Sequence, residues 1–234
     1  MITAIIFDLG GVLIDWNPEY LYRKIFNNES EMKHFLEKIC TPEWNEQQDA
    51  GRTLKEATET LIHEYPQNEQ NIRAYYNRWH EMLGGAIEGT VDILRKLKES
   101  KKFKIYALTN WSAETFPIAL ERYEFLRWFD GVVVSGTEKK RKPFHEFYRI
   151  LLDRYEVKAE EALFIDDNLR NVEAAKQVGI DTIHFTSSGQ LTEELLERGI
   201  DGKIKFLILF YQIFHNAFLQ LWLLILFLQT KIAR

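Results

Sequence analysis

Three aspartates stand at the ends of short apolar runs that are typical of buried β-strands. Asp8 ends the run Ile-Ile-Phe near the amino terminus, and Asp166 and Asp167 end the run Ala-Leu-Phe-Ile far along the chain. Strands of this kind, parallel in one sheet, bring such acids to its carboxyl edge. Three carboxylates at one edge repel each other unless a hard cation lies among them, so these residues predict a catalytic Mg²⁺ site.

Two further segments complete a set of four motifs, each at a predicted strand end or helix start. In chain order the motifs are Asp8-Leu9-Gly10-Gly11-Val12, Ala107-Leu108-Thr109-Asn110, Lys142-Pro143 and Asp166-Asp167-Asn168. Their order and spacing resemble those of the haloacid dehalogenase-like hydrolase superfamily. The resemblance extends over residues 1–198.

The elements that must position these motifs alternate along the chain. Strand-like runs are separated by amphipathic segments, which predicts an α/β fold with a Rossmann-like, doubly wound parallel sheet. We assign this catalytic core to residues 1–16 and 86–200. Strands are expected at residues 3–8, 103–109, 131–135, 162–166 and 181–186, and helices at about 90–100, 112–123, 144–154 and 168–178.

Residues 17–85 show no comparable strand, only helix-like stretches rich in aromatic residues, Glu and Lys. They predict a helical cap inserted after the first motif, and the resemblance implies that such a cap closes over the site and carries substrate selectivity. Thr53 is expected to be a helix N-cap, with Glu56 completing a capping box. Two roles are compatible with Arg52: it could contact the substrate, or it could be an exposed arginine with a structural role. The cap helices are expected near residues 18–27, 29–40, 53–65 and 68–83.

The resemblance implies a role for each acid. Asp8 would be the nucleophile, whose carboxylate attacks phosphorus and forms an aspartyl phosphate that water then hydrolyses. Mg²⁺ would be held by Asp8, the backbone carbonyl of Gly10, and Asp166 or Asp167. One of the last two acids could instead orient Lys142, and the sequence does not assign them.

The second and third motifs supply groups suited to a phosphoryl group. The Thr109 hydroxyl and backbone N–H groups beside Asn110 can hold a phosphate oxygen at a helix start, although the same residues can also serve only as a helix cap. Lys142, before Pro143, would place a positive charge against the nucleophile and the transferring phosphoryl group. Asn110 ends the second motif and Trp111 directly follows it, and both are expected to face the substrate.

Position 10 departs from the family pattern. Relatives commonly carry a second Asp two residues after the nucleophile, where it protonates the leaving alcohol and then activates water. This chain has Gly10 instead. The change predicts slow turnover of substrates with poor leaving groups, or acid–base work by another residue. Asp15 is one conceivable substitute, but it could equally cap the start of the helical insertion.

Three functions are compatible with these residues, and the first is favoured. It is a Mg²⁺-dependent phosphatase of a small phosphorylated metabolite such as a sugar phosphate. The alternative is a 2-haloacid dehalogenase, which uses the same nucleophilic Asp without metal. Such enzymes usually carry hydroxyl residues where this chain has Asp166 and Asp167. A catalytically weakened binding or membrane-recruited protein is the third, and the retention of Asp8 and Lys142 argues against it.

Composition narrows the class of protein. The chain has 234 residues, 46% apolar and 28% charged, as in ordinary globular proteins. Its net charge of −5 and lack of a basic cluster argue against nucleic acid as the main partner. Cys40 is the only cysteine, so it is expected to be a buried packing residue in a reducing compartment. The amino terminus shows no secretory signal, which predicts a cytoplasmic catalytic body.

Residues 203–234 form a hydrophobic tail of different composition. No charged residue occurs from Phe206 to Thr230, so by length and charge this run is a transmembrane helix candidate. Polar side chains inside the run oppose insertion, because burial in lipid is unfavourable without partners. Membrane contact through residues 206–230, packing on another chain, and a non-native extension are therefore three open interpretations.

Overall fold

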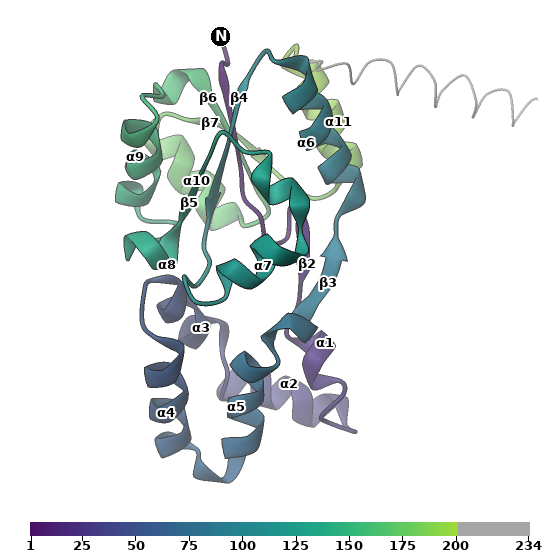
Figure 1. Ribbon diagram of the computed structural model, residues 1–234, viewed down its shortest axis with the longest axis vertical. Helices are drawn as coiled ribbons and strands as arrows, with labels where there is room; N and C mark the ends of the chain where they lie inside the picture. The colour runs from purple at the N-terminus through teal and green to yellow at the C-terminus, as the bar shows by residue number, and fades with distance from the viewer. Residues whose placement is uncertain (201–234) are drawn as a thin grey trace, which may run out of the picture.

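The computed structural model describes residues 1–200, and five parallel strands form its central sheet. The strands are β1 (Ala4–Phe7), β4 (Lys104–Thr109), β5 (Gly131–Val134), β6 (Ala162–Asp166) and β7 (Asp181–His184). Their order is β5-β4-β1-β6-β7, so the first strand of the chain lies in the middle (Figure 1). The predicted parallel sheet is confirmed.

Helices cover both faces of this sheet, because successive strand side chains point to opposite faces. The core helices are α6 (Glu88–Ser100), α7 (Phe116–Arg122), α8 (Ser135–Glu138), α9 (His145–Arg154), α10 (Leu169–Val178) and α11 (Ser188–Glu197). Ile5 and Phe7 of β1 share a buried cluster with α6 and α11, whereas Ala4 and Ile6 share another with α9 and α10. Figure 1 shows α6 and α11 on one side of the sheet and α9 and α10 on the other. With both faces covered, the strand ends are left for ligands.

A helical insertion occupies the chain between β2 (Ile14–Trp16) and β3 (Leu83–Ala86). Its helices are α1 (Glu19–Tyr22), α2 (Glu29–Lys38), α3 (Pro42–Asp49), α4 (Leu54–Glu64) and α5 (Glu69–Asn77). Aromatic rings fill its interior: Tyr22 lies 4.9 Å from Phe35, and Trp44 lies 5.1 Å from Tyr75, centroid to centroid. Cys40 is buried, as predicted.

Local capping explains where two of these helices begin. The Thr53 hydroxyl accepts a hydrogen bond from the backbone N–H of Glu56 at 3.2 Å, so the predicted N-cap of α4 is confirmed. Thr41 caps α3 in the same way by accepting from the N–H of Trp44, and Pro42 occupies the first turn. Helix α3 was not predicted from the sequence, because only Trp44 and Gln48 of its eight residues are buried and its apolar pattern is weak.

The prediction that no strand occurs between the first strand and residue 86 is wrong. β2 and β3 form an antiparallel two-stranded ribbon, with Ile14 opposite Ala86 and Asp15 opposite Gly85. Each strand is too short, and β3 too rich in glycine, to be recognised from its own residues. They pair because the chain enters and leaves the insertion at one place. The helix expected over 68–83 accordingly ends at Asn77.

The insertion is held against the core by polar contacts of α3 and α4. The carboxylate of Glu46 in α3 forms ion pairs with Arg141 at 2.9 Å and Arg170 at 2.5 Å, both core residues. The Leu54 N–H at the start of α4 donates to the Glu114 carboxylate at 2.8 Å. Arg141 therefore lies at the boundary between the insertion and the core. These contacts hold the end of α3 near α8 (Figure 1).

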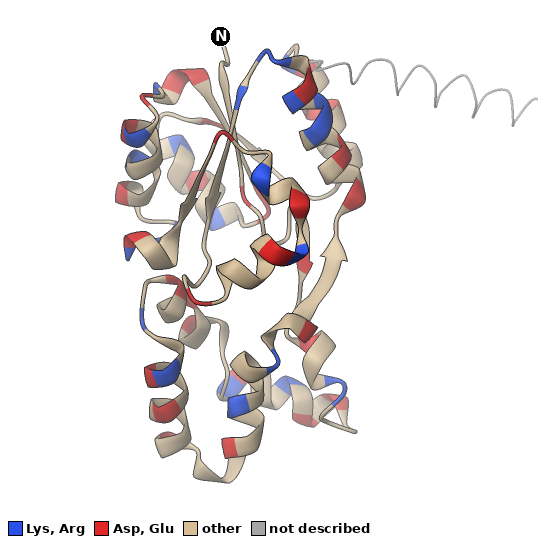
Figure 2. Cartoon of the chain, viewed as in Figure 1, with Lys and Arg blue, Asp and Glu red and all other residues tan. Residues whose placement is uncertain are grey.

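Charged residues of both signs are interspersed over the outer faces of the helices (Figure 2). Many form exposed pairs one turn apart, such as Arg73 with Glu69, and such pairs contribute little to stability. None of the helices within residues 1–200 is both long and apolar enough to span a bilayer. The hydrophobic tail predicted at 203–234 lies outside the described residues.

Candidate active site

The carboxyl edge of the sheet brings the three predicted aspartates together. β1 and β6 pair with Phe7 level with Ile165, so the next residues, Asp8 and Asp166, emerge side by side. The backbone N–H of Asp8 donates to the Ile165 carbonyl at 2.8 Å. One carboxylate oxygen from each of Asp8, Asp166 and Asp167 lies within 4.8 Å of the other two. Three hard oxygen donors at this spacing suit a single cation such as Mg²⁺ or Ca²⁺.

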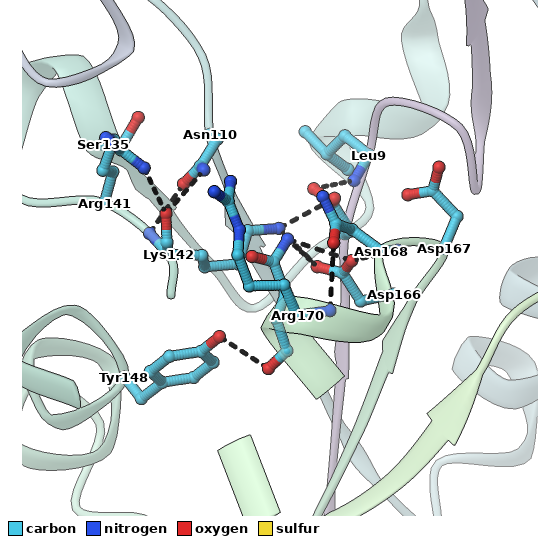
Figure 3. Close-up of polar contacts among 12 residues, drawn as sticks. Leu9, Asn110, Ser135, Arg141, Lys142, Tyr148, Asp166, Asp167, Asn168 and Arg170 are labelled. Atoms are coloured by element: carbon cyan, nitrogen blue, oxygen red, sulfur yellow. Dashed lines mark hydrogen bonds and ion pairs between the residues drawn. The ribbon is translucent and has the colours of Figure 1, made fainter. Parts of the chain in front are cut away.

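Lys142 is fully buried and connects Asp8 with Asp166. Figure 3 shows Lys142 beside Asp166. Its Nζ lies 2.7 Å from Asp8 Oδ2 and 2.7 Å from Asp166 Oδ2. The ammonium also lies 5.5 Å from the centroid of the Phe164 ring beneath it. Burial alone would lower the pKa of Lys142, but the charges of Asp166 and Asp8 outweigh that and raise it. A fixed positive charge therefore lies beside the predicted nucleophile.

Asn110 fixes the backbone that carries this lysine (Figure 3). Its side-chain oxygen accepts from the Lys142 N–H at 2.8 Å, and its side-chain nitrogen donates to the Lys142 carbonyl at 3.0 Å. Sequence reasoning placed Asn110 against the substrate. The structure shows its amide engaged with Lys142, so its observed contact is a positioning one.

The two adjacent acids have different surroundings. Asp166 is fully buried, and besides Lys142 it accepts from the Asn168 N–H at 2.8 Å and from the Asn171 side-chain nitrogen at 3.1 Å to each oxygen. Asp167 is exposed and lies against Gly11, where an added Cβ would come within 2.3 Å of its Oδ2. Asp166 is therefore the acid that orients Lys142, and Asp167 is the one more open to a ligand.

The acids carry more negative charge than Lys142 can neutralise. Burial raises the pKa of Asp8 to about 8; the Lys142 charge opposes the rise, and the charges of Asp166 and Asp167 add to it. Partial desolvation by the surrounding protein and the charge of the neighbouring Asp166 also raise the pKa of Asp167. A raised pKa disfavours the ionised carboxylate that a nucleophile needs. A bound cation would reverse this by stabilising the ionised form.

Thr109 ends β4 beside Asp8's strand and is fully buried. Its hydroxyl oxygen has no hydrogen-bond partner among the described residues. A buried polar atom without a partner is unfavourable, and a ligand oxygen at the site would satisfy it. This orphaned hydroxyl fits the predicted phosphate contact.

A cavity lies between this edge and the helical insertion. Its lining includes both aromatic and polar residues: Trp16, Tyr76, Trp79 and Trp111, together with Gly10, Asn45, Asp49, Asn110, Ser112 and Thr115. An adjoining pocket shares Trp16, Asn45, Asp49 and Asn110 with it and reaches Asp8 and Asp167. Trp111, expected to face the substrate, thus lines the cavity, with its ring nitrogen donating to Thr115 at 3.1 Å.

Arg52 and Asp15, which the sequence left open, make structural contacts. Arg52 donates to the Gln48 side chain at 2.8 Å and to the Trp44 carbonyl at 3.2 Å, so it closes the end of α3. Asp15 lies on the β2–β3 ribbon and accepts from the Tyr20 hydroxyl at 2.7 Å. Neither lines the cavity or the adjoining pocket.

Sequence reasoning missed Asp49, Glu46 and Asn171. The sequence analysis assigned no role to any of the three. Asn171 follows the fourth motif by one helical turn, and that spacing is a signal that could have found it. For the other two no local signal exists, because their partners belong to distant parts of the chain.

Comparison with known proteins agrees with this geometry. The family model of haloacid dehalogenase-like hydrolases matches residues 5–185. A sesquiterpene phosphatase of Aspergillus oryzae is 31% identical over 79% of this chain and 90% of its own length. A phosphorylated carbohydrates phosphatase of Thermotoga maritima is 27% identical over 86% of this chain and 94% of its own.

Solved structures show the same fold. A haloacid dehalogenase family enzyme of Bacteroides thetaiotaomicron, solved with magnesium and inorganic phosphate, superposes with a TM-score of 0.60. The two chains are 24% identical, and the match covers 80% of this chain and 96% of that one. By its motifs, its sheet and the match over most of its length, this chain belongs to the haloacid dehalogenase-like hydrolases.

Proposed function

We propose that this protein is a Mg²⁺-dependent phosphomonoester hydrolase, which acts on a small phosphorylated metabolite through an aspartyl phosphate on Asp8. The observation that carries the proposal is the buried Lys142 between Asp8 and Asp166, with Asp167 close enough to share a cation. The phosphatase relatives, and the magnesium and phosphate in the Bacteroides protein, support it.

Each residue of the site has its own role in the proposed reaction. Asp8 attacks phosphorus, the bond to the leaving oxygen breaks, and water later hydrolyses the aspartyl phosphate to regenerate Asp8. Lys142 and the Thr109 hydroxyl hold phosphoryl oxygens, and Asp166 keeps Lys142 in place. When bound, Mg²⁺ would be held by Asp8, the Gly10 carbonyl and the Asp166–Asp167 pair, chiefly Asp167, and would neutralise developing charge.

The dehalogenase alternative fits these residues less well. A metal-free displacement at carbon has no use for both Asp166 and Asp167. Their charges would also keep the pKa of Asp8 raised, which disfavours the ionised nucleophile that such a reaction needs.

Two substrate classes suit the cavity. Asn45, Ser112 and the other polar lining residues can bind the hydroxyl groups of a sugar phosphate, as the sequence analysis proposed. The walls formed by Trp16, Trp79 and Trp111 favour a phosphate ester of an apolar alcohol instead. The names of the Thermotoga and Aspergillus relatives support one class each.

A phosphate-release assay on the full chain tests the proposal. With Mg²⁺ we expect hydrolysis of at least one class in a panel of sugar phosphates and prenyl or alkyl phosphates, and loss of that activity in EDTA. Halide release from 2-haloacids is measured in parallel. Halide release that resists EDTA, or no phosphate release from any ester, would refute the phosphatase.

Gly11→Ala is expected to weaken Mg²⁺ binding specifically. Gly11 has φ +74°, and a Cβ there would collide with the Asp167 carboxylate. Displacing Asp167 should raise the Mg²⁺ concentration for half-maximal activity by roughly tenfold. Gly199→Ala is the matched control, because Gly199 has φ +71° but nothing within 4 Å of its Cβ position. Both variants should lose similar stability, on the order of 1 kcal/mol, from the backbone alone. Equal Mg²⁺ titrations would contradict the assignment of Asp167.

A further inference from the structure

The proposed reaction needs a proton donor on the side of phosphorus opposite Asp8. In-line displacement places the leaving oxygen there, away from the sheet edge and toward the helical insertion. The core supplies no donor at position 10: Gly10 has no side chain, and a Cβ built on it would meet nothing within 4 Å. The space that a second aspartate would enter is therefore open, and it belongs to the cavity that Gly10 lines.

Asp49 lines the same cavity as Gly10 and comes from the helical insertion. It is the last residue of α3, and it lines both the cavity shared with Gly10 and the pocket that reaches Asp8 and Asp167. Two features hold it there. Glu46, one turn earlier, is paired with two core arginines, and the following turn at Gly51 packs against the side chain of Lys139.

The surroundings of Asp49 suit proton exchange. Burial raises its pKa to about 7, and the nearby Glu46 charge adds to the rise; Arg141, Lys142 and the Ser112 backbone N–H oppose it. The Arg141 guanidinium is engaged by Glu46 at 2.9 Å. A carboxyl group poised near neutral pH can give up a proton in one step and take one back in the next.

We infer that Asp49, reaching the site from the helical insertion, is the general acid and base that Gly10 does not provide; this rests on the proposed phosphatase function. As Asp8 bonds to phosphorus and the phosphorus–oxygen bond to the alcohol breaks, the Asp49 carboxyl gives its proton to the alcohol oxygen. Water then enters where the alcohol left, loses a proton to the Asp49 carboxylate, bonds to phosphorus and releases Asp8. The cycle returns both acids to their starting states.

Asp15, the substitute considered from sequence, does not have this placement. Its carboxylate accepts from the Tyr20 hydroxyl at 2.7 Å, and it lies against Gly84 on the neighbouring strand. It lines neither the cavity nor the adjoining pocket. Asp15→Asn is therefore a matched control for Asp49→Asn.

The dependence on leaving group tests the inference. Asp49→Asn should lower kcat/KM for an alkyl phosphate about 100-fold or more, but for 4-nitrophenyl phosphate less than about tenfold, because nitrophenolate leaves without a proton. Since water activation is also impaired, this variant should release a burst of nitrophenolate equal to the enzyme and accumulate phosphorylated Asp8. Asp15→Asn should behave like the unmodified protein with both esters.

Rescue from the core provides a second measurement. Asp49→Asn combined with Gly10→Asp should recover alkyl phosphate hydrolysis, because the open space at position 10 accommodates a carboxylate. Equal losses on both esters, without a burst or rescue, would mean that Asp49 only shapes the cavity and would overturn the inference. Absence of Mg²⁺-dependent phosphate release in the unmodified protein would instead overturn the proposed function.

Discussion

Asp8→Asn is expected to abolish turnover and leave the fold intact. The amide cannot form the aspartyl phosphate, so we expect a loss of at least about 10⁴-fold in kcat with any ester. The folded state should tolerate the change because the substitution is isosteric and removes one of three crowded carboxylates, while Lys142 keeps Asp166 as a partner. Phosphate release checks the loss of turnover, and thermal unfolding of the same preparation checks that the fold is intact.

Two outcomes would contradict this expectation. Turnover by Asp8→Asn within tenfold of the unmodified protein would remove Asp8 as nucleophile. Loss of activity together with loss of cooperative unfolding would show that the acid is needed for the fold instead. A phosphorylated intermediate trapped from the unmodified protein, and absent from Asp8→Asn, gives independent support.

Lys142→Met is expected to lower both activity and stability. The substitution keeps an unbranched stem on Phe164 but removes the ammonium that contacts Asp8 and Asp166, leaving two buried acids without this partner. The free energy of unfolding should fall by about 3 kcal/mol. Activity should fall by at least about 100-fold, because the fixed charge that stabilises the phosphoryl group is lost.

Adding Mg²⁺ distinguishes the loss of stability from the loss of activity. In Lys142→Met the ion should recover part of the lost thermal stability, since it supplies positive charge to the same acids, yet activity should stay low. Lys140→Met is the matched control: Lys140 is about half exposed and pairs with Glu146 at the surface, so both properties should be unchanged. Normal activity of Lys142→Met at saturating Mg²⁺ would contradict the proposed role of this lysine.

The separate surroundings of Asp166 and Asp167 also explain why their roles stayed open at the level of sequence. Adjacent residues at the end of a strand point in different directions. One therefore turns into the core toward Lys142 and Asn171, and the other toward Gly11 and solvent. The sequence motif shows that two acids are present. Their different surroundings follow only from the direction of the backbone at the end of β6.

The elements of the insertion were predicted less well than those of the core. Core strands are buried on both faces and appear as continuous apolar runs, so β1, β4 and β6 were found close to their observed limits. The ribbon of β2 and β3 and the helix α3 lack such patterns, because their stability comes from pairing and from contacts with distant residues.

The α/β core and the four motifs could be predicted from the amino-acid sequence alone, as could the chemistry expected of Asp8, Thr109, Lys142 and the acid pair. These are local properties: apolar runs specify strands, and strand ends specify where side chains meet. The tertiary structure was needed to show that Asn110 holds the Lys142 backbone, that Glu46 joins α3 to the core, and that Asp49 lines the same cavity as Gly10. Those relations join residues far apart in the chain, and no local pattern encodes them.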